Sequence, residues 1–513
     1  MTKPESNPTV KFKIIFAGLI IFFGILFFID LKPGSPEVTY TAAIAVLIAL
    51  WWVTEALPIG VTSLLPILLF PALGVLDGKT ISNSYINYII FLYIGGFIMA
   101  LALEKWNLHK RIALKILSLT GSKPIMILFG FMFAAAFLSM WMSNTATAMM
   151  MLPIAFSVIT ALTEVVGEEH IHRYRTGLLL SIAYACSIGG ISTLVGTPPN
   201  LSFVRIFEII FPAGPEISFG QWALFALPLT IAMFVITLLF LYFRYKPSPE
   251  MSNLKKNFFI KRYEELGPVS TNEKRVLALF CLLIFLWFFR KEIELGSLSI
   301  PGWSAIFKHP QFINDGTIAI FVAVLLFVIP SKQKNEGLVT WEITKKIPWN
   351  IVFLFGGGFA LANGFIESGL SAYIGNQLAE AKSLSNLGLI GVVTAMMSGL
   401  TEFTSNTATT EMMLPIISGL ATEIQVNPLL LMIPVTLAAS MAFMFPVATP
   451  PNAIIFSTGK LSMMEMMKAG FVLNLIAIVL ITLLTLFWGP AVLPIDLTSY
   501  PEWAVEGAKT MGH

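Results

Sequence analysis

Two copies of one polar motif interrupt an otherwise apolar chain. Residues 143–154 read SNTATAMMMLPI and residues 405–416 read SNTATTEMMLPI, identical at ten of twelve positions. A second pair follows, since residues 195–200 read VGTPPN and residues 447–452 read VATPPN. Proline lacks the amide donor and pushes the preceding residue out of the α region, so a helix must break at each TPPN. Broken helices expose carbonyls, which coordinate cations, and amides, which attract anions.

Long uncharged runs must carry these motifs through a membrane, because a bilayer core requires about 20 apolar residues per helix. The sequence predicts an all-α polytopic membrane protein with about 11 transmembrane helices and two helical hairpins, each of which re-enters or fully crosses the membrane twice. Hairpins are expected at 124–163 and 387–425, each with an SNT tip, and broken helices at 177–211 and 428–457. The other predicted spans are 14–30, 41–57, 59–76, 87–104, 221–244, 275–290, 314–331, 349–366 and 466–489.

Composition supports a membrane protein and excludes several classes. Only 12% of residues are charged, 56% are hydrophobic and the mean hydropathy is +0.81, whereas ordinary soluble domains are about 25% charged. A soluble enzyme and a disordered scaffold are therefore excluded. The net charge of +3 offers no basic face for nucleic acid. Cys186 and Cys281 both lie in apolar runs and predict neither a disulfide framework nor a metal cluster.

Charge distribution gives the predicted organisation and orientation. With a cytoplasmic N-terminus, 24 of the 32 Lys and Arg fall on the inside and 7 on the outside, as the positive-inside rule requires. This places the C-terminus outside. The first span resembles a signal peptide but has no small-residue cleavage site. The predicted parts are scaffold spans at 1–85, a first repeat at 86–244, a cytoplasmic linker at 245–274, scaffold spans at 275–348, a second repeat at 349–489 and a C-terminal tail at 490–513.

The two repeats are predicted to have opposite orientations. Five spans separate the two SNT segments, and an odd number turns the second hairpin toward the opposite face of the membrane. Inverted repeats are typical of secondary transporters, whose sites lie near the midplane where the repeats meet. A duplicated packing motif without function is the alternative. It does not explain why the most similar residues are polar and lie at membrane depth.

Few other polar residues interrupt the apolar runs. Arg205 lies just after the first break, and anchoring near an interface is favoured over clamping substrate. Glu402 is interpreted as a structural hydrogen-bonding residue, with proton coupling as the alternative. Glu411 has no counterpart, because Met149 occupies the matching position. His170 and His172 are expected in a solvated loop.

The paired SNT and TPPN motifs and the charged linker resemble the divalent anion/sodium symporter family over about residues 40–490. The resemblance implies that both hairpins are re-entrant helical hairpins, and it implies a homodimer with a fixed scaffold and a transport domain that moves as an elevator. It implies no enzymatic activity and no cofactor beyond sodium as coupling ion. The basic residue that follows SNT in sodium-independent exchangers is replaced here by Ala146-Thr147 and Ala408-Thr409. Sodium-coupled symport of succinate, malate or fumarate across a cell membrane is therefore expected.

The resemblance also assigns residues. One sodium site would use Ser139, Ser143, Asn144 and Gly196, and the other Thr401, Thr404, Asn406 and Ala448. The substrate anion would be contacted by Ser143, Asn144, Thr145, Thr197, Ser405, Asn406, Thr407, Thr449 and Pro450. Gly196 and Ala448 differ, which is harmless if both act through carbonyls. A sodium-independent dicarboxylate exchanger and a sodium-coupled citrate or sulfate carrier remain open, whereas broken helices disfavour a channel. A membrane enzyme is disfavoured because no metal-protease or nucleophile–histidine motif occurs.

Overall fold

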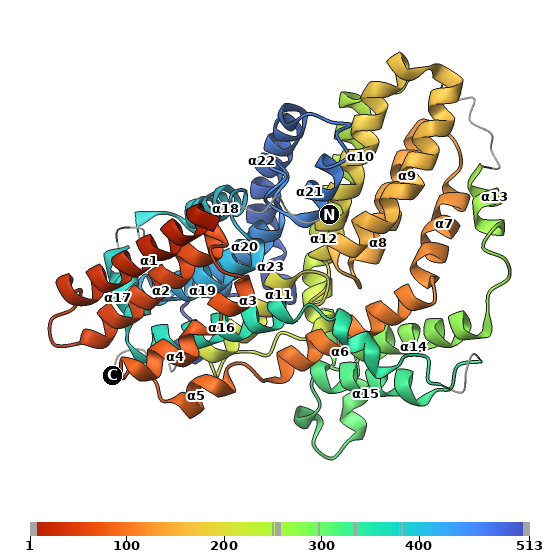
Figure 1. Cartoon of the computed structure of the whole chain (residues 1–513). Helices are drawn as coiled ribbons and strands as arrows, with labels where there is room; N and C mark the ends of the chain where they lie inside the picture. The colour runs from red at the N-terminus through yellow and green to blue at the C-terminus, as the bar shows by residue number, and fades with distance from the viewer. Residues whose placement is uncertain are drawn as a thin grey trace.

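The computed structural model describes residues 8–248, 251, 258–295, 298–332, 336–378, 380 and 383–505. These residues are almost entirely helical (Figure 1). The β-structure within them is a short antiparallel hairpin of β1 (Ile293–Leu295) and β2 (Leu298–Ile300) and one isolated bridge between Pro330 and Gly337. The predicted linker 245–274 and the predicted tail 490–513 lie partly outside the described residues, as do several lysines used for the orientation.

The N-terminal helices only partly match the predicted spans. They are α1 (Pro8–Phe28), α2 (Pro36–Thr54), α3 (Ile59–Thr62), α4 (Leu65–Ala72) and α5 (Gly78–Asn83). The predicted span at 59–76 is interrupted, because α3 ends at Thr62 and α4 begins at Leu65. Pro66 lies in the first turn of α4, where its missing amide is harmless, but the same proline cannot continue a helix from α3.

The first repeat follows the predicted order of hairpin and broken helix. It contains α6 (Tyr88–Lys105), α7 (Leu108–Thr120), α8 (Pro124–Ser139), α9 (Asn144–Val166), α10 (Glu168–Gly190), α11 (Pro198–Ile210) and α12 (Phe219–Arg244). His170 and His172 are exposed as expected, but the predicted loop is wrong: both lie in the first turns of α10. Gly167 has a φ of 82° and ends α9, and Glu168 and Glu169 then favour a new helix N-terminus.

The middle of the chain joins the two repeats. Its elements are α13 (Phe258–Glu264), α14 (Thr271–Phe288), the β-hairpin, η2 (Trp303–Ile306), η3 (Pro310–Phe312), α15 (Asp315–Val328) and η4 (Trp341–Lys346). Ser270 and Glu273 form a capping box that fixes where α14 begins.

The second repeat contains α16 (Trp349–Glu367), α17 (Leu370–Gln377), α18 (Asn386–Thr401), α19 (Asn406–Glu423), α20 (Leu429–Ser440), α21 (Pro450–Phe456), α22 (Met463–Phe487) and α23 (Gly489–Val492). Among the described residues, seven helices are long and apolar enough to cross a membrane by length and composition. Several shorter apolar helices accompany them, including the first half of each hairpin (α8 and α18) and the first half of the second broken helix (α20).

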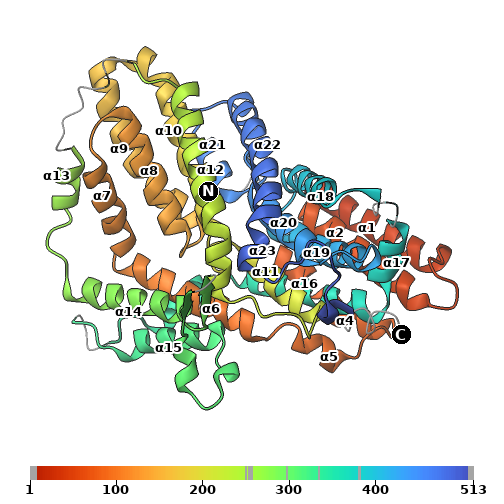
Figure 2. The ribbon, with the colours of Figure 1, turned by 180° about the vertical axis from the view of Figure 1, so that it is seen from behind.

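The two repeats pack crosswise. Helix α11 of the first broken helix packs on α19 and α20, whereas α21 of the second broken helix packs on α9 and α10. Both ribbon views place α7 to α10 in one arm and α1, α2 and α17 at the other end (Figures 1 and 2). Helix α6 packs along α15 between them. Each hairpin is therefore in contact with the broken helix of the other repeat, and one large apolar core runs through both repeats.

Candidate functional site

The tip of the first hairpin is held by a hydrogen bond between its two arms. Helix α8 ends at Ser139 and α9 begins at Asn144. The Ser139 hydroxyl donates to Asn144 Oδ1. The Ser143 hydroxyl accepts from the amide of Ala146 at 3.2 Å and so caps α9. The SNT segment is thus a helix N-terminus whose half-buried side chains lie beside the end of α8.

The second hairpin repeats this bond 262 residues later. Thr401 ends α18 and its hydroxyl donates to Asn406 Oδ1 at 2.6 Å. The same hydroxyl also lies 2.8 Å from the carbonyl of Ala439, the residue before the last of α20. Because Ser139 matches Thr401 and Asn144 matches Asn406, the sequence repeat is also a repeat of contacts. Ser405 differs from Ser143, since its side chain caps nothing.

Both broken helices break at the predicted motif. The first is interrupted between Gly190 and Pro198, and the second between Ser440 and Pro450. Thr197 and Thr449 are the N-cap residues of the second halves, with φ of −145° and −149°. An extended backbone is what proline imposes on the residue before it. The break therefore follows from the sequence itself.

The asparagine of each TPPN motif holds the break in shape. Asn200 Nδ2 donates to the carbonyls of Ile191 and Thr193 at 3.2 and 2.7 Å. Asn452 Nδ2 donates to the carbonyls of Ala442 and Phe445, both at 3.1 Å. Both side chains are fully buried, and neither Oδ1 atom has a hydrogen-bond partner among the described residues. The sequence analysis assigned no role to either asparagine. Their position directly after two prolines was the feature of the sequence that could have indicated one.

Three of the four residues predicted for the first sodium site, Ser139, Asn144 and Gly196, lie close together. A Cβ added to Gly196 would lie 2.9 Å from the carbonyl oxygen of Ser139, and one added to Gly190 would lie 2.9 Å from Asn144 Oδ1 and 3.1 Å from the Gly196 carbonyl. Three oxygen atoms from Ser139, Asn144 and Gly196 are therefore gathered around two glycines. Carbonyls of unwound backbone and half-helix ends are the usual sodium ligands in transporters of this kind. A larger side chain in place of Gly196 would have no room.

The residues predicted for the second sodium site converge only in part. Thr401 and Asn406 contact each other directly. The Thr404 hydroxyl, however, donates to the carbonyl of Leu400 at 2.7 Å and lies 2.5 Å from the Thr409 hydroxyl. Ala448 is buried in the second break, where its amide donates to the carbonyl of Phe445 at 3.3 Å. In this arrangement the hydroxyl of Thr404 is already engaged by two other groups.

Glu402 organises the second break through hydrogen bonds, which agrees with its interpretation as a structural hydrogen-bonding residue. Its carboxylate accepts hydrogen bonds from the amides of Phe443, Met444 and Phe445 at 2.8 to 3.1 Å. Asn474 Nδ2 of α22 donates to the same carboxylate at 2.6 Å. These contacts hold the unwound segment that leads to Ala448 and Thr449.

The first break is held at the matching place by different chemistry. Met140 occupies the position equivalent to Glu402, and its backbone carbonyl accepts a 2.5 Å hydrogen bond from the Thr193 hydroxyl. Each hairpin therefore ties the unwound segment of its own repeat, once through a side chain and once through the backbone. The sequence could not show this equivalence, because only one of the two residues is polar.

The predicted substrate residues fall into a buried and a half-buried group. Thr197, Thr407 and Thr449 are buried, whereas the SNT residues at 143–145 and 405–406 are half-buried and Pro450 is exposed. The hydroxyls of Thr197 and Ser440 lie 3.3 Å apart and join the two breaks. Neutral hydroxyls, side-chain amides and helix N-termini are the donors that this region offers to an anion.

Comparison with known proteins decides the family. Residues 11–495 match the family model described as the sodium:sulfate symporter transmembrane region. The chain belongs to the sodium:sulfate symporter family. Membership makes it a helical, multi-pass membrane transporter and not an enzyme.

Curated relatives in the symporter family match along nearly the whole chain. The sodium-dependent dicarboxylate transporter SdcS of Staphylococcus saprophyticus is 43% identical over 474 residues, covering 90% of this chain and 88% of that protein. SdcS of Staphylococcus aureus (strain bovine RF122) is 41% identical over 487 residues, covering 94% and 91%.

Two solved transporters share the fold of this symporter-family member at low sequence identity. The YdaH transporter of Alcanivorax borkumensis has a TM-score of 0.56 at 13% identity and covers 82% of this chain and 91% of its own. MtrF of Neisseria gonorrhoeae has a TM-score of 0.54 at 13% identity and covers 97% of each chain. At this identity the likeness concerns the fold alone.

The basic residue nearest the motifs is already paired. Arg205 Nη1 of α11 lies 3.2 Å from Glu208 Oε2, and the Tyr88 hydroxyl donates to the same glutamate. This pairing favours a structural role for Arg205 over a clamp on the substrate.

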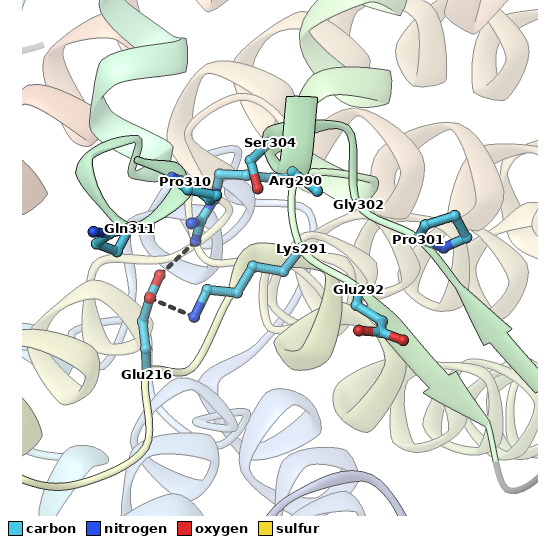
Figure 3. A pocket seen from close by; sticks show the side chains of 10 residues that line it. Glu216, Arg290, Lys291, Glu292, Pro301, Gly302, Ser304, Pro310 and Gln311 are labelled. Carbon is cyan, nitrogen blue, oxygen red and sulfur yellow. Dashed lines mark hydrogen bonds and ion pairs between the residues drawn. The ribbon is translucent and has the colours of Figure 1, made fainter. Parts of the chain in front are cut away.

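A cavity of about 450 Å³ lies elsewhere, between the α11–α12 connection and the α14–α15 connection (Figure 3). Arg290 and Lys291 both point to Glu216 there, and Arg290 also binds Asp315 at 2.6 Å. Burial works against ionisation of Glu216, but Arg290 and Lys291 outweigh it and hold the pKa of that carboxyl below its ordinary value. No predicted site residue lines this cavity, so we interpret it as an ionic junction between segments rather than as the substrate site.

Proposed function

We propose that the chain is a sodium-coupled symporter of C4-dicarboxylates such as succinate, malate and fumarate. The observation that carries the proposal is the paired contact of Ser139 with Asn144 and of Thr401 with Asn406, each beside a broken helix. Relatives of the same length are named sodium-dependent dicarboxylate transporters, which supports the same function for this chain.

The mechanism follows from the donors present. Sodium ions would bind at the oxygens of Ser139, Ser143, Asn144 and Gly196, and of Thr401, Thr404, Asn406 and Ala448. Their charge would offset the carboxylates of the substrate, held between the two SNT tips by Ser143, Asn144, Thr145, Thr197, Ser405, Asn406, Thr407, Thr449 and Pro450. Substrate would bind well only after sodium, because the site contributes no basic side chain of its own. The coupling of substrate uptake to sodium would then follow directly from this charge compensation.

The crosswise packing of the repeats supports alternating access. In inverted repeats, the helices α8 to α12 and α18 to α22 would move together as a transport domain against the scaffold predicted at 1–85 and 275–348. We propose an elevator-type movement in a homodimer. We further propose a plasma or inner membrane location, with the N-terminus in the cytoplasm and the C-terminus outside, from the distribution of Lys and Arg.

Uptake of labelled succinate into proteoliposomes tests the proposal. An inward sodium gradient is expected to drive uptake, and Asn144→Ala or Asn406→Ala is expected to abolish it. Asn376→Ala is the matched control, because Asn376 is an exposed asparagine of α17 whose side-chain amide donates to the carbonyl of Ala372 in the same helix. Equal uptake without sodium would contradict symport and favour an exchanger.

Sulfate is the competing substrate, because the matching family model is described by sodium and sulfate. Unlabelled sulfate or citrate is expected to compete weakly with labelled succinate. Stronger inhibition by either anion than by unlabelled succinate would move the substrate assignment to that anion while leaving sodium coupling intact.

A further inference from the structure

One carboxyl group at the meeting of the two repeats has no role in the site described above. Glu411 lies on α19, is 0% exposed, and is packed between α11 and α16. Its Oε1 atom lies 2.5 Å from the Ser202 hydroxyl of α11. Gly358 of α16 gives the carboxyl its space, because a Cβ at that position would come within 2.6 Å of Glu411 Cγ and closer still to the carboxyl itself.

The partners of Glu411 differ sharply from those of Glu402. Four N–H groups donate to the carboxylate of Glu402, which satisfies an ionised group. Glu411 has a single hydroxyl partner, and its Oε2 atom has none among the described residues. A buried ionised carboxylate without donors or a cation is far more costly than a neutral acid. The geometry therefore fits a carboxylic acid with its proton on Oε1.

A proton on Oε1 completes a short chain of hydrogen bonds. The acid would donate to the Ser202 hydroxyl, whose own proton is directed to the carbonyl of Pro198 at 3.4 Å. Pro198 is the first residue of α11 and belongs to the first TPPN motif. The remaining oxygen, Oε2, is then a neutral carbonyl, which can stay unpaired at much smaller cost than a charged one.

The charged groups nearby do not change this conclusion. On α11, Arg205 and Glu208 pair with each other, and on α18 the terminal Glu402 is held by the second break. The described residues contain no ion pair that includes Glu411. The other helices packed on α19 carry few titratable groups, and α20 has none within its bounds. These groups are Glu37 and Tyr40 on α2, Glu367 on α16 and Tyr373 on α17. On α19 itself, the other titratable residue is Glu423 at the end of the helix.

We propose that Glu411 is a proton site at the contact between the first broken helix and the second hairpin. It holds a proton while α11, α16 and α19 are packed as in this structure, and exchanges it with water only when these helices separate. The matching residue in the other repeat, Met149, is 60% exposed and cannot share this function. One proton per chain is therefore bound asymmetrically.

Linkage gives the direction of the effect. The packed arrangement binds the proton more tightly than the separated one, so acid favours the packed arrangement and alkaline pH favours separation. Any transport step that separates α11 and α19 from α16 then depends on pH through a single group. This last consequence rests on the proposed function, whereas occupancy of the site by a proton does not.

Infrared spectroscopy of the full-length protein in lipid tests occupancy directly. A protonated carboxylic acid gives a carbonyl band that shifts on deuteration. We expect Glu411→Gln to lose this band and Glu402→Gln to retain it, because four N–H donors favour the ionised form of Glu402. Ser202→Ala is expected to move the band to higher wavenumber, because the acid loses its acceptor. A band that survives in Glu411→Gln, or a carboxylate band that disappears in its place, would overturn the proposal.

The pH profile of sodium-driven succinate uptake is the second measurement. It is measured from neutral to alkaline pH, where the substrate carboxylates stay ionised. We expect Glu411→Gln, which mimics the neutral acid, to transport and to have a flatter profile than the unmodified chain. Identical profiles would overturn the link to transport. Absence of sodium-driven uptake in the unmodified chain would instead contradict the proposed function, with the infrared result standing independently.

Discussion

The sharpest prediction concerns Glu402, which ties the second hairpin to the second break. Replacing it with alanine removes the acceptor of three backbone amides and of Asn474. An unsatisfied buried donor costs about 1–3 kcal/mol. Two of the four donors belong to residues that are themselves buried, Phe443 and Asn474. Counting only these two, the binding-competent shape of the break loses about 2–6 kcal/mol.

The lower end of this range is already measurable as a change in sodium affinity. About 2 kcal/mol corresponds to a factor of roughly 30 in an equilibrium constant. The half-saturating sodium concentration for succinate uptake is therefore expected to rise by roughly 30-fold or more in Glu402→Ala. The measurement is initial uptake into proteoliposomes over a series of sodium concentrations at constant ionic strength.

Met140→Ala is the matched control, because Met140 occupies the same position in the first hairpin. There the acceptor is a backbone carbonyl, which the substitution retains. The truncated side chain is expected to lower thermal stability while leaving the sodium dependence unchanged. If Glu402→Ala folds and shows the sodium dependence of the unmodified chain, the argument that this carboxylate shapes the second break is refuted.

Four further substitutions follow from particular contacts. Asn200→Ala and Asn452→Ala each remove two hydrogen bonds to carbonyls of the helix breaks. Each is therefore expected to lower the free energy of unfolding by about 1–3 kcal/mol, measured in a thermal melt. An unchanged stability in both variants would contradict the role given to these asparagines. Gly358→Ala is expected to reduce folded yield because its Cβ would strike a buried carboxyl; normal yield would show that α16 can shift. Arg290 lowers the pKa of Glu216, so the ion pair between them stabilises the fold fully at pH values above the ordinary glutamate pKa of about 4.3. This stabilisation is lost as the pH falls through the lowered pKa of Glu216. Glu216→Gln should remove this part of the acid dependence of the melting temperature, and an unchanged dependence would contradict it.

Much of the architecture could be predicted from residue order, because proline acts locally. The two TPPN motifs broke their helices where expected, and the SNT segments began helices at Asn144 and Asn406. Hydrophobic runs also located most of the other helices. Local signals failed at two places: a proline split the stretch at 59–76, and a helix N-terminus formed where a loop with His170 was expected.

The candidate site could be predicted only in outline. The family resemblance assigned Ser139, Asn144, Thr401 and Asn406 to the two sodium sites, and the structure brings these residues together in pairs. The partners of Glu402 could not be predicted, because its donors lie about forty and seventy residues away and depend on how α18 packs on α20 and α22. The hydrogen-bond partners of Glu402 are therefore set by tertiary packing and not by the local sequence.

Sodium-driven accumulation of labelled succinate is the measurement that tests the central claim most directly. Proteoliposomes containing the purified chain receive an inward sodium gradient or an equal potassium gradient, with and without the Asn144→Ala and Asn406→Ala changes. The account predicts accumulation with sodium only, and loss of accumulation in both variants. Equal uptake with potassium, or full uptake in both asparagine variants, would contradict it.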